Sequence, residues 1–87
     1  MEGRPKSPAE HAMSRQTLDT SGLTCPLPVL KAKKAMRDVP PGGELEVLST
    51  DPGSREDFEA YCEVTGHRLV EASGQDGVFR FLIARKD

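Results

Sequence analysis

Residues 26–50 read PLPVLKAKKAMRDVPPGGELEVLST, and this stretch predicts a helix followed by a strand. Its apolar residues first recur every three or four positions, as on one face of a helix. They are Val29, Ala32, Met36 and Val39. The run PPGG at 40–43 then ends the helix. Leu45 and Val47 alternate with glutamates, which is the two-residue period of a half-buried strand at 44–50.

The flanking sequence predicts a second helix and three more strands. QTLDTS at 16–21 alternates as a short strand does, and HRLVEA at 67–72 and VFRFLIA at 78–84 indicate two strands joined by a turn, SGQDG, at 73–77. Residues 54–65 place their apolar side chains on one helical face, and a glycine follows as a stop signal. The predicted order of elements is therefore βαβαββ.

Crossover connections are right-handed, so both helices are expected on the same side of the sheet. The sequence thus predicts an α/β fold: a two-layer α/β sandwich with a four-stranded mixed sheet and two helices on one face. Residues 1–15 hold almost nothing apolar, and we expect a flexible N-terminal tail there, either an unstructured leader or a functional arm. The domain is expected at 16–87.

The composition describes one small domain. The 87 residues are 36% hydrophobic and 30% charged, which allows a thin core but neither two cores nor a deep substrate cavity. A net charge of −2 argues against a dedicated nucleic-acid binder. No apolar run is long enough to span a membrane, and the N-terminus lacks the apolar segment of a secretory signal. We therefore expect a cytoplasmic protein without membrane contact.

The two cysteines, Cys25 and Cys62, lie far apart in the chain and form no CxxC pair. With lone histidines at His11 and His67, we expect neither a disulfide scaffold nor a metal site. Cys62 falls on the apolar face of the second helix, which favours a buried core thiol over a resolving cysteine. His67 is the only candidate base for Cys25 and is better explained as a structural histidine, so a self-contained cysteine hydrolase is not expected.

Cys25 precedes a helix N-terminus, where the helix dipole favours thiolate over thiol. Pro26 and Pro28 fall in the first turn and carry no N–H, so the donors expected to face the sulfur are those of Leu27 and Val29. The prolines also stiffen the turn, which would hold the sulfur outward, within reach of a partner protein. The alternative is that Cys25 is a small buried hydrophobe.

Two motifs of the chain occur together. One is a CPxP motif inside LDTSGLTCPLPVLKAKKAM, made by Cys25, Pro26, Leu27 and Pro28. The other is the pair Asp51 and Pro52 inside GGELEVLSTDPGSREDFEAYCEVTGHRL. From about Leu18 to the C-terminus, the chain resembles the TusA (SirA-like) sulfur-carrier family, whose two-layer βαβαββ fold matches the predicted elements.

The resemblance implies that Cys25 accepts sulfane sulfur as a persulfide and relays it to an acceptor protein. The implied donor is a cysteine desulfurase or a rhodanese, and the relay could serve tRNA thiolation, sulfur oxidation or cofactor sulfuration. The protein would be a carrier without a bound cofactor rather than a stand-alone enzyme. The motif residues supporting Cys25 would be Pro26, Leu27, Pro28, Asp51 and Pro52. Asp51 is equally well explained as an N-cap, with Ser54 and Asp57 offering a second cap.

The charge pattern suggests a partner surface. The first helix carries a net charge of +3 and includes the candidate contacts Lys33 and Lys34, while residues 44–63 sum to −6. Such asymmetry would steer a charged partner toward Cys25, although solvated helix faces have the same composition.

Two other functions remain open. One is a thiol redox or regulatory protein-interaction domain that uses Cys25 with Cys62. The other is a small RNA-binding domain, suggested by a general resemblance of the architecture to the C-terminal domain of translation initiation factor three. All four aromatic residues fall where core packing would use them, which speaks against RNA stacking. They are Phe58, Tyr61, Phe79 and Phe81.

Overall fold

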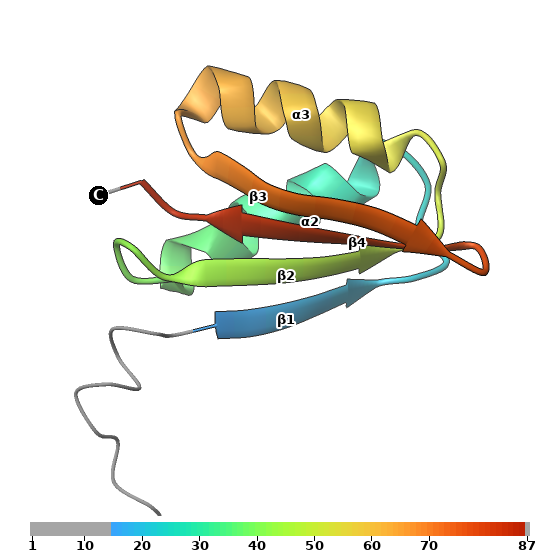
Figure 1. Cartoon of the computed structure of the whole chain (residues 1–87), viewed down its shortest axis with the longest axis horizontal. Coiled ribbons are helices and arrows are strands. Elements are labelled where there is room, and N and C mark those ends of the chain that lie inside the picture. Colours follow the sequence, from blue (N-terminus) through green and yellow to red (C-terminus); the bar gives the residue numbers. More distant parts are fainter. Residues whose placement is uncertain (1–14, 87) are drawn as a thin grey trace, which may run out of the picture.

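The alternating stretch after the double proline forms strand β2, Glu44–Ser49, in a computed structural model that describes residues 15–86. Strand β1 (Arg15–Thr20) pairs parallel to β2, and β4 (Val78–Ala84) pairs antiparallel to it. Strand β3 (Arg68–Gln75) pairs antiparallel to β4 and completes the order β1-β2-β4-β3 (Figure 1). The predicted four-stranded mixed sheet is confirmed.

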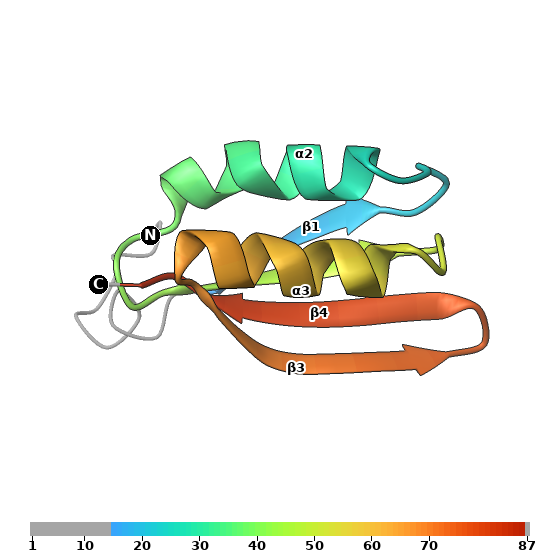
Figure 2. The ribbon, with the colours of Figure 1, turned by 90° about the horizontal axis from the view of Figure 1, so that it is seen from above.

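Two helices cover one face of this sheet. Helix α2 spans Leu27–Ala35 and continues as a 3₁₀ turn, η1, at Met36–Asp38, and helix α3 spans Ser54–Thr65. Figure 2 shows the helices side by side, with their N-terminal ends at the same end of the molecule. The predicted two-layer α/β sandwich with the order βαβαββ is therefore correct.

The core lies between the helices and the central strands. Phe58 of α3 is fully buried and stacks on Phe81 of β4 with ring centroids 4.8 Å apart. Leu45 and Val47 of β2 face the same layer, as their alternation predicts. The complete cluster of buried residues is Ala32, Met36, Val39, Leu45, Val47, Phe58, Cys62, Phe81 and Ile83. Phe79 and Tyr61 pack against it, so the aromatic side chains serve the core as expected.

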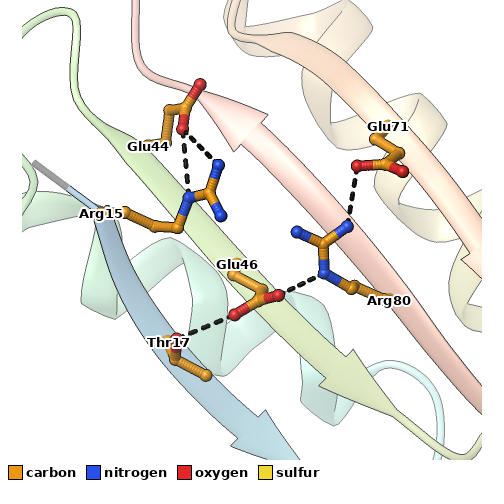
Figure 3. A network of polar contacts seen from close by, with 6 residues as sticks. All are labelled: Arg15, Thr17, Glu44, Glu46, Glu71 and Arg80. Atoms are coloured by element: carbon orange, nitrogen blue, oxygen red, sulfur yellow. Dashed lines mark hydrogen bonds and ion pairs between the residues drawn. The ribbon is translucent and has the colours of Figure 1, made fainter. Parts of the chain in front are cut away.

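The other face of the sheet carries a ladder of ion pairs (Figure 3). Arg80 on β4 bonds to Glu46 on β2 and, at 2.7 Å, to Glu71 on β3. Both glutamates lie directly opposite Leu82 in the strand register, and Leu82 is only 4% exposed although it lies outside the helix-facing core. Charged side chains with long apolar stems can cover such a residue. The stems of these charged side chains thus account for the burial of Leu82 on the open face of the sheet.

Three local expectations were wrong. The hairpin turn is not SGQDG: β3 runs through Gln75, and only Asp76 and Gly77, with φ of 54° and 81°, connect it to β4. Two residues with positive φ match the twist of a hairpin, so this short turn is favoured over a longer one. Helix α2 also ends earlier, because the backbone tightens into η1 before the prolines.

The third difference is at the start of the domain. Arg15, expected in the tail, is the first residue of β1, where its guanidinium bonds to Glu44 at 3.2 Å. The remainder of the expected tail, residues 1–14, lies outside the described residues.

Candidate functional site

The candidate site lies where β1 and β2 end and both helices begin. Because the two strands are parallel and each is followed by a helix, their C-terminal ends and the helix N-termini meet at one edge of the sheet. The two connecting loops are tied together by the Gly22 N–H, which donates to the Thr50 hydroxyl at 2.8 Å. This contact holds the loop containing Cys25 against the loop containing Asp51.

Cys25 is exposed, two residues before α2, and two carboxylates contact it. Its Sγ donates to Oδ2 of Asp57 in α3 at 2.5 Å. Its backbone N–H donates to Oδ2 of Asp51 at 2.9 Å. The predicted outward position of the sulfur is confirmed, whereas the alternative of a small buried hydrophobe is wrong.

The electrostatic environment of the sulfur is the reverse of the expected one. The hydrogen bond to Asp57 is the largest cause that raises the pKa of the Cys25 thiol to about 11, and the charges of Asp57 and Asp51 add to it. A carboxylate accepting the S–H favours the neutral thiol, because ionisation would place two negative charges side by side. Of the two expected helix donors, the Leu27 N–H is engaged elsewhere, since it donates to the Thr24 carbonyl at 2.8 Å.

Asp51 is not the N-cap of α3. The helix begins at Ser54, its N-cap position is Gly53, and no side chain caps it. The turn is instead built inside the protein: the Ser54 hydroxyl bonds to the Ser49 hydroxyl at 2.6 Å, and both residues are fully buried. The Ser49 hydroxyl also accepts from the Asp51 N–H at 3.2 Å. This buried serine pair fixes the loop that aims Asp51 at Cys25.

The other motif residues shape the entry to α2 and α3. Pro26 is the N-cap residue of α2 and is joined to Cys25 by a cis peptide bond. Pro28 is in the first helical turn and is fully buried, while Leu27 is 42% exposed beside the cysteine. Pro52 is exposed in the turn that leads to α3.

Cys62 and His67 take no part in this site. Cys62 is buried in the core, as predicted, and burial raises the pKa of its thiol to about 11. His67 follows the C-terminal end of α3, about 18 Å of helix away from its start. There His67 Nδ1 accepts the Lys86 N–H at 3.1 Å, which agrees with the structural role expected for this residue.

Lys33 and Lys34 lie in the last turn of α2, about 9–11 Å along the helix from its first residue, Leu27, which lies beside Cys25. Lys33 lines a surface hollow of about 360 Å³ together with Arg37, Arg85 and Lys86. Basic residues therefore gather at the end of the molecule away from Cys25, and carboxylates surround the sulfur. The expected steering of a partner by these lysines toward Cys25 does not fit this arrangement.

Sequence reasoning missed the roles of Asp57, Ser49 and Ser54. The sequence offers Asp57 as a possible helix cap and as part of the family resemblance but not as a contact of the cysteine, yet it bonds to the sulfur across 32 positions of sequence. Its signal was its place in the first turn of a helix that begins at the same sheet edge as Cys25. Ser49 continues the buried alternation of Leu45 and Val47, so the pattern itself marked it as an inward-facing polar residue.

Within residues 15–86, no group of three or more His, Cys, Asp or Glu side chains is placed to hold a metal ion. In the same span, neither α2 nor α3 has the length and apolar character needed to cross a membrane.

Comparisons of the sequence and of the fold with known proteins identify relatives of this chain. The sequence pattern of the family Sulfurtransferase TusA matches residues 16–85. A Neisseria meningitidis serogroup A protein is 53% identical over 74 residues, covering 85% of this chain and 100% of the relative. The sulfur carrier protein TusA of Allochromatium vinosum is 49% identical over 70 residues, with 80% and 92% covered. A crystal structure of a SirA-like protein from Desulfitobacterium hafniense superposes with a TM-score of 0.72 at 31% identity, covering 83% of this chain and 99% of that one.

Proposed function

The chain belongs to the TusA family of sulfurtransferases, and we propose that it is a sulfur carrier whose Cys25 holds sulfane sulfur as a persulfide. In the loading step the Cys25 sulfur attacks the terminal sulfur of a persulfide on a donor protein. A new S–S bond forms at Cys25, the S–S bond of the donor breaks, and the donor cysteine leaves as a thiolate that takes the Cys25 proton. The sulfane sulfur moves from one cysteine to another, which exchanges a persulfide and a thiol for a thiol and a persulfide, so no external oxidant or reductant is needed.

The exposure of Cys25 is the observation that carries this proposal. Thiol exchange between two proteins requires a sulfur that a second active site can reach. Leu27 and Leu30, on the first turns of α2 beside Cys25, are 42% and 52% exposed and give a partner an apolar surface to cover. A protein partner fits this exposed setting better than an enclosed small substrate does.

The proposal extends to the partners and the compartment. The donor is a cysteine desulfurase or a rhodanese, and the acceptor is another protein of a relay that ends in tRNA thiolation, sulfur oxidation or cofactor sulfuration. A cytoplasmic location suits the chemistry, because a reducing compartment keeps a carrier thiol free. Pro26, Leu27, Pro28, Asp51 and Pro52 support Cys25, and Lys33 and Lys34 contact a partner at a distance from the sulfur.

The test is intact-protein mass spectrometry after incubation with a cysteine desulfurase and free cysteine. Wild-type protein is expected to gain one or more sulfur atoms that a reductant removes, whereas Cys25→Ser gains none. Cys62→Ser is the matched control and should still gain sulfur, because Cys62 is buried. Equal loss in both variants, or no gain with several desulfurases and rhodaneses, would contradict the proposal.

The two alternative functions find less support in the structure. Cys25 is on the surface beside the start of α3, whereas Cys62 lies inside the core, and both are free thiols. Phe58 and Phe81 are fully buried and stack on one another, so their rings are not available to nucleotide bases.

A further inference from the structure

The two carboxylates beside Cys25 have no positive partner in the described part of the chain. The ion pairs of residues 15–86 involve Glu44, Glu46, Glu59 and Glu71, and none involves Asp51 or Asp57. The charged groups that act on the sulfur are Asp57 from α3 and Asp51 from the loop after β2. The sulfur thus lies beside two carboxylates that a cation from another molecule could pair with.

Resting on the function proposed above, we propose that Asp57 is a latch: its carboxylate holds the proton on the Cys25 sulfur until a lysine or arginine of the docked donor pairs with Asp57. The geometry points to this because Asp57 Oδ2 accepts the S–H at 2.5 Å, and Asp57 is only half-buried beside the exposed Cys25. A cation at that oxygen competes with the S–H and cancels the charge that opposes ionisation. The Cys25 proton is then released to water, the thiolate attacks the terminal sulfur of the donor persulfide as the donor S–S bond breaks, and the departing donor thiolate takes up a proton from water.

The arrangement around Cys25 predicts which side chains the surface of the donor protein carries. A fitting partner presents a basic residue next to its sulfur-bearing cysteine, with apolar side chains around it for Leu27 and Leu30. Away from such a surface the carrier thiol stays protonated and resists oxidation. After loading, both carboxylates repel the persulfide anion, which favours its transfer to the acceptor.

The size of the effect follows from the pKa. A thiol with a pKa of about 11 has roughly one hundredth of the thiolate that a pKa of 9.0 would give at pH 7.5. Nucleophilicity rises with pKa with a coefficient of about 0.4–0.5, which returns about tenfold of that loss. Removing the charge of Asp57 should therefore speed the reaction of Cys25 several-fold, up to about tenfold, at neutral pH.

The first assay is alkylation of Cys25 by iodoacetamide across pH, resolved from Cys62 by peptide mass spectrometry. Asp57→Asn should move the midpoint of the pH profile down by about one to two pH units, because desolvation and the charge of Asp51 remain, and it should raise the rate at pH 7.5 several-fold. Glu56→Gln is the matched control, since it removes one negative charge from the neighbouring exposed position of the same helical turn. An unchanged profile in Asp57→Asn, or an equal shift in Glu56→Gln, would overturn the proposal.

The second assay tests the cation. Cystamine is a disulfide with two ammonium groups, and oxidised 3-mercaptopropionate is a similar disulfide with two carboxylates. Wild-type Cys25 should exchange with cystamine at least about tenfold faster, and the preference should largely disappear in Asp57→Asn but persist in Glu56→Gln. Equal rates with both disulfides in the wild type would refute the latch. Neither assay uses a sulfur donor, so failure of the carrier function and failure of the latch give different results.

Discussion

Replacement of Ser54 by alanine tests whether the buried serine pair holds the site loop. Ser54 and Ser49 are 1% and 0% exposed, and their hydroxyls are 2.6 Å apart. The change removes one hydrogen bond, worth about 1 kcal/mol net, and leaves the Ser49 hydroxyl with one partner fewer in the interior, which costs about 1 kcal/mol more. Ser54→Ala should therefore lower the free energy of unfolding by about 2 kcal/mol, a large share of the stability of a domain this small.

The assay is urea denaturation, with Ser73→Ala as the matched control because Ser73 is exposed on β3. With a slope near 1 kcal/mol/M, Ser54→Ala should move the midpoint down by about 2 M, and the control by less than about 0.5 M. In a double-mutant cycle, Ser49→Ala with Ser54→Ala should be less destabilising than the two single changes added, since no hydroxyl is left unpaired. A Ser54→Ala midpoint equal to the control, or strict additivity, would refute the reasoning.

Three further predictions concern the core, the sheet and the hairpin. Burial raises the pKa of Cys62 to about 11, so the native state keeps a proton that the unfolded chain loses near pH 9. The free energy of unfolding should therefore fall as the pH rises from about 9 to 11. Urea titrations at several pH values should show a smaller fall for Cys62→Ala. Arg80→Ala removes the ion pairs to Glu46 and Glu71 and should lower the free energy of unfolding by about 1 kcal/mol at low salt. The loss should be smaller in 1 M salt, which screens charges. An equal loss at low and high salt would contradict an electrostatic origin. Gly77→Ala places a Cβ on a residue with φ of 81°, and although no atom lies within 4 Å of that Cβ, the strained backbone should lower the free energy of unfolding by about 1 kcal/mol. An unchanged melting temperature would argue against this turn conformation.

The helices and strands were predictable because their signals are local. The alternation of Leu45 and Val47 and the helical spacing of Ala32, Met36 and Val39 report which side of each element faces the core. The same reasoning was less accurate where a choice depends on neighbouring strands. In β3, the ladder shifts register between Leu69 and Glu71, so Leu69 and Ala72, three positions apart, both pack against the core.

The sequence by itself also identified Cys25, its CPxP motif and the buried state of Cys62. Only the tertiary structure decided the charge around the sulfur, because Asp57 and Asp51 are 32 and 26 positions away from Cys25 in the chain. The local argument counted the helix dipole near Cys25 and predicted a favoured thiolate. A carboxylate at hydrogen-bond distance acts more strongly than a partial charge at a helix end, and its position depends on the sheet edge where two loops meet. That is why the fold could be predicted from residue patterns, whereas the protonation state of Cys25 could not.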